Sequence, residues 1–320
     1  HRSRAGEREI PPAVLGKLRA SYLVNASRNM RIYHDLKGIL EAFRAAGIPV
    51  LVLKGAHIAE LVHRDLGARA MADLDILIRE ADADRAHRAM TGLGYRRDEL
   101  HGERPAEGNE FHYAGRDKHV LVEVHWRLFS AFYPFRFDQE AIWRNARPTA
   151  LGGAPAAVLS PEDLLLHVAA HASVHMFAFG LRDLCDTAQI VRSAGDSLDW
   201  DRILGQAGDW EVANCAYLTL LLASRLLGAG VPGRVLEDLR PEDFDESYFD
   251  AAKKAILAPP RSSPDEPPPH PNLVLLFGRK GTGAKAAILA RKFFPSRRAI
   301  AALYPVSARS PRRSARPGTT

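Results

Sequence analysis

Apolar residues recur with helical spacing in the first part of the chain and with strand spacing directly after it. Residues 10–47 predict two helices. The apolar face of the second helix contains Ile32, Leu36, Ile39, Leu40 and Phe43. The β-branched run at residues 48–53 predicts a buried strand, and a further helix is expected to begin at Ala56. We therefore expect N-terminal helices, over residues 1–47, that pack on a core beginning with a strand.

A second strand, a helix and a hairpin follow. Alternation over Asp73–Ile78 predicts a strand, and apolar spacing over residues 81–92 predicts a helix closed by glycine. The segments 111–114 and 119–126 flank a Gly-Arg-Asp-Lys turn and predict a hairpin. Strands and helices in this order indicate an α/β core with a mixed sheet over residues 48–150.

The pattern becomes helical after this core. Ser160 is a favourable N-cap, and Asp163 completes a capping box with it. Helical periodicity continues to Leu227, so we expect a mainly helical domain over residues 151–306, with a Pro-rich linker at 259–271. The predicted fold class is α+β: an α/β core with a mixed sheet, followed by a mainly helical C-terminal domain.

Charge is distributed unevenly along the chain, whose formal net charge is +6. Residues 272–320 contain 11 Lys and Arg and no acid, whereas residues 1–271 contain 33 basic and 38 acidic residues. The segment 307–320 is predicted to be a basic, disordered tail, which can solubilise the chain or bind nucleic acid, an anionic membrane or an acidic protein. The mildly acidic body disfavours extensive contact with RNA.

Composition narrows the class of protein further. Hydrophobic residues make up 46% of the chain and aromatic residues 8%, which is sufficient for packed cores. No apolar run is long enough to span a bilayer. The two cysteines, Cys185 and Cys215, are too few for a disulfide framework, and we expect both to be buried, reduced thiols. These features favour a cytoplasmic protein.

Three acids on predicted strands indicate a site for divalent cations. Alternation places Asp73 and Asp75 on one face of their strand, where two neighbouring carboxylates repel each other unless a cation lies between them. Glu123 can join them if its strand is adjacent. Three such acids can hold two metal ions about 3.5–4 Å apart, an arrangement used in phosphoryl transfer. The alternative is an exposed acidic strand face without a ligand.

Basic and small residues near these strands indicate phosphate binding. Lys54, Gly55 and Ala56 follow the first strand, where small residues and free N–H groups at a helix start allow a phosphate to approach. Arg69 lies shortly before the acidic strand and can contact phosphate or acceptor. Lys54 and Arg69 can instead be ordinary solvated residues of a turn and a loop.

Histidines and a charged stretch are further candidates. His125 shares a strand face with Glu123, and we favour a role in orienting a metal ligand over coordination or simple packing. His167, His171 and His175 share one helix face, where packing is favoured over contacts to a nucleotide or acceptor, and a zinc site is disfavoured.

The charged stretch near these histidines begins at Arg182. Together with Asp183 and Asp186, this arginine can form a buried ion-pair network or line a cleft between the two predicted domains. His125, His171, His175 and Arg182 are therefore candidates for supporting a metal site or contacting an acceptor.

Three motifs occur in a characteristic order: Leu-Lys-Gly-Ala at 53–56, Arg-Ala-Met-Ala-Asp-Leu-Asp-Ile-Leu-Ile at 69–78 and Glu-Val-His-Trp-Arg-Leu at 123–128. This order resembles the uncharacterised nucleotidyltransferase family of bacteria, within the DNA polymerase β-like superfamily. The resemblance implies a nucleotidyltransferase core in which three acids are catalytic and bind metal. These are Asp73, Asp75 and Glu123. It also implies nucleotide contacts from Lys54, Gly55, Ala56 and Arg69.

The expected activity is transfer of a nucleoside monophosphate from a nucleoside triphosphate, with ATP favoured, to a hydroxyl or phosphate acceptor, with release of pyrophosphate. The implied cofactor is Mg²⁺ or Mn²⁺ in a two-metal mechanism. A small molecule, peptide or protein is favoured as acceptor over RNA. One alternative is a toxin-like enzyme that modifies the ends of tRNA or other RNA. An alternative of another class is a non-catalytic module that binds a nucleotide or a partner, which the three acids disfavour.

Overall fold

The computed structural model describes residues 10–97, 108–115, 120–131 and 133–258. Within these residues, one mixed sheet contains seven strands: β1 (Val50–Val52), β2 (Asp73–Ile78), β3 (Arg96–Arg97), β4 (Glu110–Ala114), β5 (Leu121–His125), β6 (Arg147–Leu151) and β7 (Ala154–Val158). Their order across the sheet is β3-β4-β5-β2-β1-β7-β6. The predicted α+β fold class is confirmed.

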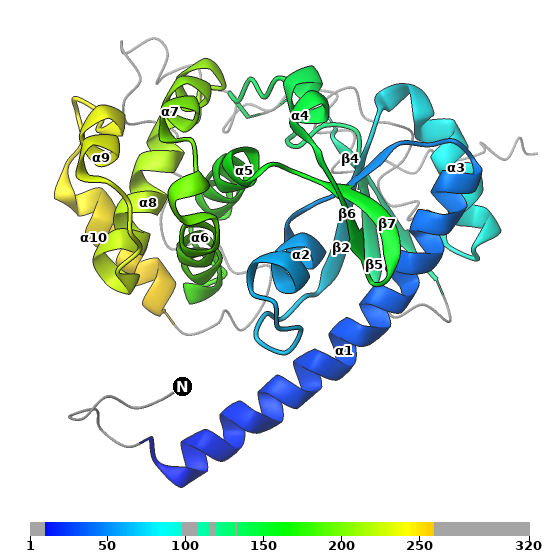
Figure 1. The fold of residues 1–320 in the computed structure, drawn as a ribbon. Helices are drawn as coiled ribbons and strands as arrows, with labels where there is room; N and C mark the ends of the chain where they lie inside the picture. The colour runs from blue at the N-terminus through cyan, green and yellow to red at the C-terminus, as the bar shows by residue number, and fades with distance from the viewer. Residues whose placement is uncertain (1–9, 98–107, 116–119, 132, 259–320) are drawn as a thin grey trace, which may run out of the picture.

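Helices cover the sheet and form the C-terminal half of the described chain (Figure 1). Those around the sheet are α1 (Pro12–Ala45), α2 (Lys54–His57), α3 (Ala83–Gly92) and α4 (Gln139–Asn145). A π-helical turn, Ile58–Val62, continues α2, and a 3-10 turn, Glu80–Asp82, precedes α3. The helical part contains α5 (Pro161–Val174), α6 (Leu181–Ala194), α7 (Trp200–Asp209), α8 (Ala213–Leu227), α9 (Gly233–Leu239) and α10 (Glu246–Leu257).

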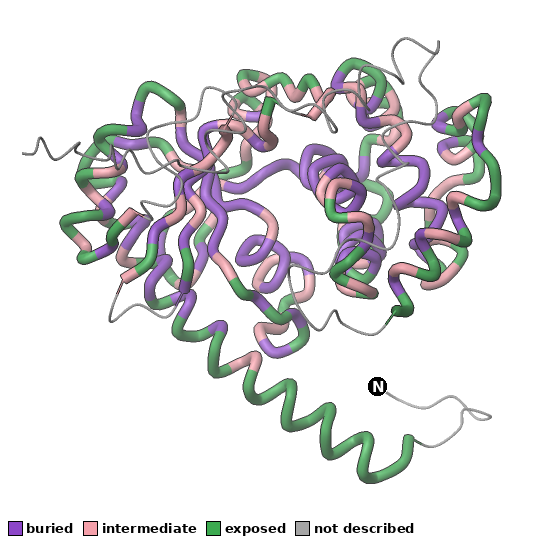
Figure 2. Tube along the Cα trace, turned by 180° about the vertical axis from the view of Figure 1, so that it is seen from behind, coloured by how far each residue is buried: buried purple, intermediate pink, exposed green. Residues whose placement is uncertain are grey.

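The N-terminal segment forms one long helix, so the prediction of two helices is wrong. No proline or glycine turn interrupts the chain between Pro12 and Ala45, and the helix tolerates Gly16 and Gly38. Its second half packs on the sheet, where the predicted face from Ile32 to Phe43 is buried. Its first half extends beyond the sheet and is exposed (Figure 2).

Two apolar cores meet at the sheet. One lies between α1, α3 and the sheet face that carries Leu74, Ile76 and Ile78. The other is formed mainly by α5, α6 and α8 and includes Leu77 from the opposite face of β2. One face of β2 is therefore directed toward α1, and the other toward the helical part of the chain.

The strands β6 and β7 extend the sheet beyond its expected end. They form an antiparallel hairpin, and Val158 of β7 pairs with Val52 of β1 in parallel. The boundary predicted at residue 150 therefore falls within β6, and the sheet continues to Val158. The predicted linker at 259–271, the remainder of the helical domain to 306 and the basic tail at 307–320 lie outside the described residues.

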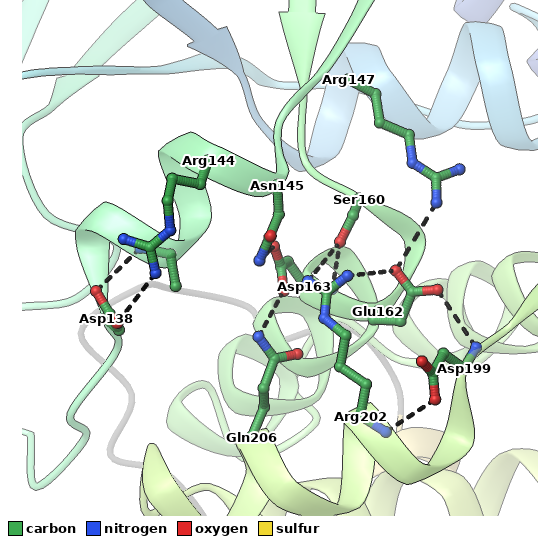
Figure 3. Close-up of polar contacts among 11 residues, drawn as sticks. Asp138, Arg144, Asn145, Arg147, Ser160, Glu162, Asp163, Asp199, Arg202 and Gln206 are labelled. Carbon is green, nitrogen blue, oxygen red and sulfur yellow. Dashed lines mark hydrogen bonds and ion pairs between the residues drawn. The ribbon is translucent and has the colours of Figure 1, made fainter.

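A polar network connects the core to the helical part (Figure 3). Asp163, which is fully buried at the start of α5, accepts hydrogen bonds from Arg202 Nη2 at 2.6 Å and Gln206 Nε2 at 3.1 Å in α7. Asn145 of α4 approaches the same carboxylate at 3.4 Å. Ser160 Oγ accepts from the Asp163 backbone N–H, as the capping box predicts. This network fixes α5, and therefore its inward face, relative to α4 and α7.

Candidate active site

Neighbouring strands bring two of the predicted acids together. The strands β2 and β5 are parallel, and Asp75 is directly opposite Glu123. Residues in register on adjacent strands point to the same side of a sheet. Leu77, two residues after Asp75, belongs to the core shared with α5. Asp75 and Glu123 therefore lie on the sheet face that is directed toward the helical part.

Lys54 neutralises the deepest of these acids. Its Nζ lies 2.9 Å from Asp75 Oδ1, and Asp75 is 1% exposed. The contact follows from the antiparallel pairing of β1 with β2, because the Leu53 N–H donates to the Asp75 carbonyl just before Lys54 begins α2. The predicted turn after β1 is instead the first turn of α2. Lys54 thus contacts an acid at the place where we expected it to contact phosphate.

His125 lies between the carboxylates of three acids. Its Nε2 is 3.2 Å from Asp75 Oδ1 and 3.5 Å from Glu123 Oε2, and its Nδ1 is 2.8 Å from Glu110 Oε2. Glu110 is a residue that sequence reasoning missed. Glu110 is opposite His125 in the sheet, a pairing that the predicted hairpin did not give, because its first strand was expected to begin at residue 111.

The charges of this cluster are strongly coupled. Burial opposes ionisation of Asp75, but the ammonium of Lys54 and the hydrogen bond from His125 outweigh it and hold the pKa of Asp75 well below its ordinary value. Burial likewise opposes protonation of His125, yet Glu110 and the other acids raise the pKa of His125 well above 6.5. The acids around His125 therefore favour its charged form.

The other two predicted acids have raised pKa values. Burial and repulsion from Asp75 raise the pKa of Asp73, against the opposing positive charges of Lys54, Arg182 and Arg69. Burial, and then repulsion from Asp75 and Glu110, raises the pKa of Glu123, although its hydrogen bond with His125 acts in the other direction. A raised pKa makes a carboxylate a better proton acceptor.

Asp73 lies at the edge of the cluster. Asp75, Glu123 and His125 each offer a ligand atom within 4.8 Å of one another, and among the described residues this group does not include Asp73. Asp73 is half-buried and is opposite Leu121 in the sheet. Its carboxylate nevertheless lies within the electrostatic influence of Lys54 and Asp75.

The residues around Gly55 form a compact support. The Tyr33 hydroxyl donates to the Ala56 carbonyl at 2.5 Å, which connects α1 to α2. Arg69 is buried and donates from Nε to Asp186 Oδ2 at 2.9 Å, and His63 Nε2 lies 3.0 Å from Asp186 Oδ1. The network expected among Arg182, Asp183 and Asp186 therefore takes a different form, because Asp186 pairs with residues of the core while Arg182 Nε lies 3.7 Å from Asp183 Oδ1.

The candidates from α5 and α6 lie near the turn that joins these helices. The rings of His171 and His175 are 4.4 Å apart, whereas His167 is buried and contacts Phe129 edge-on at 5.5 Å. Burial, and then the charge of Lys54, keeps the pKa of His171 well below 6.5. Arg182 lies close enough to Asp73 to oppose the rise in its pKa. This turn therefore borders the acidic cluster.

The two cysteines, both predicted to be buried, differ in their exposure. Cys215 is buried in α8, as expected, whereas Cys185 is exposed, so the prediction that both are buried is wrong. Asp183 and Leu184 occupy the inward face of α6, which leaves Cys185 on its outer face.

Among the described residues, no helix is long and apolar enough to cross a membrane.

The donor set fits a hard divalent cation. Asp75, Glu123 and the nearby Asp73 supply carboxylate oxygens, which Mg²⁺ and Mn²⁺ prefer. Asp75 is buried on a strand and has positive partners in Lys54 and His125. A buried carboxylate cluster of this kind requires positive charge, and a cation at these oxygens satisfies the same requirement.

Comparison with known proteins assigns the class. The chain matches the model of the family described as uncharacterised nucleotidyltransferase over residues 1–228. The chain belongs to this family, and the predicted enzyme class, a nucleotidyltransferase, is confirmed. A search of the curated proteins gives no match.

Two solved structures show weak similarity. One is a solution structure of the antibiotic-resistance factor ANT(2'')-Ia, with 16% identity over 56% of this chain and 91% of that chain and a TM-score of 0.40. The other is a crystal structure of ANT(2'')-Ia in complex with adenylyl-2''-tobramycin, with 15% identity over 56% and 96% of the two chains and a TM-score of 0.39.

Proposed function

We propose that the protein transfers a nucleoside monophosphate from a nucleoside triphosphate, with ATP favoured, to a hydroxyl or phosphate oxygen of an acceptor. The acceptor oxygen forms a bond to the α-phosphorus, the bond to the bridging oxygen breaks, and pyrophosphate leaves. The observation that carries this proposal is the register of Asp75 with Glu123, beside the ammonium of Lys54. This arrangement places carboxylates and a cation at the start of a helix, where a polyphosphate can bind.

Each residue has a distinct role in this proposal. Asp73, Asp75 and Glu123 would hold Mg²⁺ or Mn²⁺, which would supply positive charge to the phosphates and make the acceptor hydroxyl more acidic. Lys54 exchanges its contact with Asp75 for a contact with the departing phosphates. Gly55 and Ala56 present backbone to the triphosphate, and Glu123 accepts the acceptor's proton.

The remaining residues support this centre. His125 holds Asp75 and Glu110 in place through both ring nitrogens. Arg69 is held by Asp186 and packs beside Gly55, so it supports the backbone there. The helical part, joined to the core by the Asp163 network, borders the space where an acceptor binds. We propose a small molecule, peptide or protein as acceptor, because the acidic body is unfavourable for extensive RNA contact.

Transfer can be tested with α-labelled ATP. Purified protein is incubated with the labelled nucleotide, Mg²⁺ and fractions of candidate acceptors, and both label transfer and pyrophosphate release are measured. Glu123→Gln and Asp73→Asn should abolish both signals while the circular dichroism spectrum is retained. Asp201→Asn, at an exposed acid of α7, serves as the matched control and should be fully active. Full activity in both site variants contradicts the proposal, and nucleotide binding without any transfer favours a non-catalytic module.

A further inference from the structure

The turn between α5 and α6 presents planar side chains to solvent beside the acidic cluster. Phe179 is 42% exposed, and its ring lies 4.9 Å from the ring of His175. The guanidinium carbon of Arg182 lies 4.3 Å from the centroid of the Phe179 ring. The ring of His171 is nearly parallel to Phe179, with an interplanar angle of 8° and a centroid distance of 5.7 Å.

The backbone holds this turn in a defined shape. Met176 and Phe177 both have positive φ, at 53° and 56°, which non-glycine residues rarely adopt in succession. Phe177 is 1% exposed and anchors the turn in the core, and its N–H donates to the Ala172 carbonyl at 2.8 Å. Phe179, two residues later, is directed away from that core. The exposed ring is thus displayed by a fixed support.

Direct contacts relate this turn to the proposed nucleotide site. Arg182 stacks on Phe179 at the start of α6, and Asp186, about one helical turn later, binds Arg69 at 2.9 Å. Arg69 Nη1 lies 3.4 Å from the position of a methyl group on Gly55, the residue after Lys54, whose Nζ contacts Asp75. The aromatic turn and the acids therefore lie on either side of the contact between α6 and the core, each with a positive group beside it. A ligand that suits this surface has a flat, uncharged ring at one end and anionic groups at the other.

We propose that Phe179 and Arg182 bind the nucleobase of the nucleoside triphosphate, with the base stacked against this pair and the phosphates directed toward Lys54. This inference rests on the proposed function and adds a base-binding subsite to it. A nucleotide matches both features in one molecule. A polycationic acceptor does not, because Arg182 and Lys54 repel it. Stacking on an aromatic ring depends little on which base is stacked. This subsite should therefore bind purine nucleotides but discriminate little between adenine and guanine.

The test separates binding of the base from binding of the phosphates. Calorimetry in the presence of Mg²⁺ compares a non-hydrolysable α,β-methylene ATP with inorganic tripolyphosphate, for the wild-type chain and for Phe179→Ala. Loss of stacking should weaken binding of the ATP analogue about 5- to 100-fold. Binding of tripolyphosphate, which has no base, should be unchanged.

Two further variants show whether the ring itself is responsible. Phe179→Trp should retain or strengthen binding of the analogue, whereas Phe179→Leu, which keeps apolar area without an aromatic face, should not restore it. Leu257→Ala, at a 62% exposed residue of α10, is the control and should bind both probes like the wild type. Thermal unfolding of each variant checks that the turn has not collapsed.

The outcomes distinguish the inference from the proposed function. If the wild-type chain binds neither the analogue nor tripolyphosphate, the proposed function fails. If it binds the analogue and Phe179→Ala binds it equally well, the proposed function stands and the base-binding subsite is overturned. A rise in the acceptor's KM with unchanged nucleotide affinity also overturns it, since the ring then serves the acceptor.

Discussion

Lys54 Nζ, at the start of α2, lies 2.9 Å from Asp75 Oδ1 on β2, and this ion pair occupies the centre of the candidate active site. Asp75 is buried on the sheet face directed toward the helical part, where an unpaired charge is costly. The pair therefore has two consequences: it stabilises the fold, and it holds the ammonium of Lys54 beside the acids. Both consequences can be measured.

Removal of the lysine should destabilise the fold through the acid that it leaves behind. Lys54→Met is expected to lower the free energy of unfolding by about 3 kcal/mol, because Asp75 loses its closest positive partner. The double variant Lys54→Met/Asp75→Asn should lose less than the sum of the two single variants. Urea denaturation of all four proteins gives this coupling energy.

An exposed pair provides the reference for that cycle. Arg234 and Asp201 are joined at 2.8 Å with both side chains more than half exposed, so Arg234→Met should cost less than about 1 kcal/mol. Additive losses for Lys54→Met and Asp75→Asn would show that the buried pair has no net coupling.

Substitution of Gly55 should weaken nucleotide binding more than it lowers the stability of the fold. A methyl group at Gly55 meets Arg69 Nη1 and Met71 Sδ at 3.4 Å, an ordinary contact, and alanine favours a helix over glycine by about 1 kcal/mol. We expect Gly55→Ala to unfold at or near the wild-type temperature but to bind ATP about 10-fold more weakly, because the added methyl crowds the phosphate. Calorimetry and thermal unfolding measure the two effects.

Gly205→Ala is the matched control for this variant. Gly205 lies in α7 with no atom within 4 Å of an added methyl, so its substitution should leave nucleotide affinity unchanged. Wild-type affinity in Gly55→Ala would exclude a close approach of phosphate to this backbone.

Local patterns were sufficient to predict much of the site. Strand alternation correctly placed Asp73 and Asp75 on a shared face, and the hairpin correctly placed β4 beside β5. The adjacency of β2 and β5, which unites Asp75 with Glu123, was stated as a condition and is observed.

Features that depend on distant contacts were not predictable. The Lys54–Asp75 pair requires the register of β1 with β2, and the β6–β7 hairpin joins the sheet through pairing of Val158 with Val52, which no local signal specifies. The display of Phe179 depends on a turn with two successive non-glycine residues in the left-handed region, for which the sequence offers no glycine or asparagine.

The network around Asp163 should determine how firmly the helical part is held. Asp163→Ala removes the N3 acid of α5 and the buried carboxylate that accepts from Arg202 Nη2 and Gln206 Nε2, so Arg202 keeps only its contacts with Glu162 and Ser160. We expect a loss of about 3 kcal/mol in unfolding free energy, measured by urea denaturation. Glu246→Gln, in an exposed pair with Arg225, should cost less than about 1 kcal/mol and is the control. Equal effects of the two substitutions would show that the network is not a structural connection.

Stability should rise with pH in a window set by His57. Burial lowers the pKa of His57 to about 4 in the folded chain, against 6.5 when exposed, and its Nδ1 has no hydrogen-bond partner among the described residues. Between pH 4 and 6.5 the unfolded chain therefore binds more protons at this position, so unfolding becomes easier as the pH falls. Relative to His57→Asn, the wild type should lose about 2 kcal/mol between pH 7.5 and 5.0.

A second buried group, Asp183, should change the unfolding free energy with pH in the direction opposite to His57. Burial raises the pKa of Asp183 from 3.8 to about 6, so the folded chain binds more protons between these values and this residue favours unfolding as the pH rises. Asp183→Asn should therefore steepen the rise of stability with pH, whereas His57→Asn should flatten it. Urea denaturation at pH 5.0, 6.0 and 7.5 separates the two effects, and an unchanged slope in His57→Asn would show that this imidazole does not remain neutral in the fold.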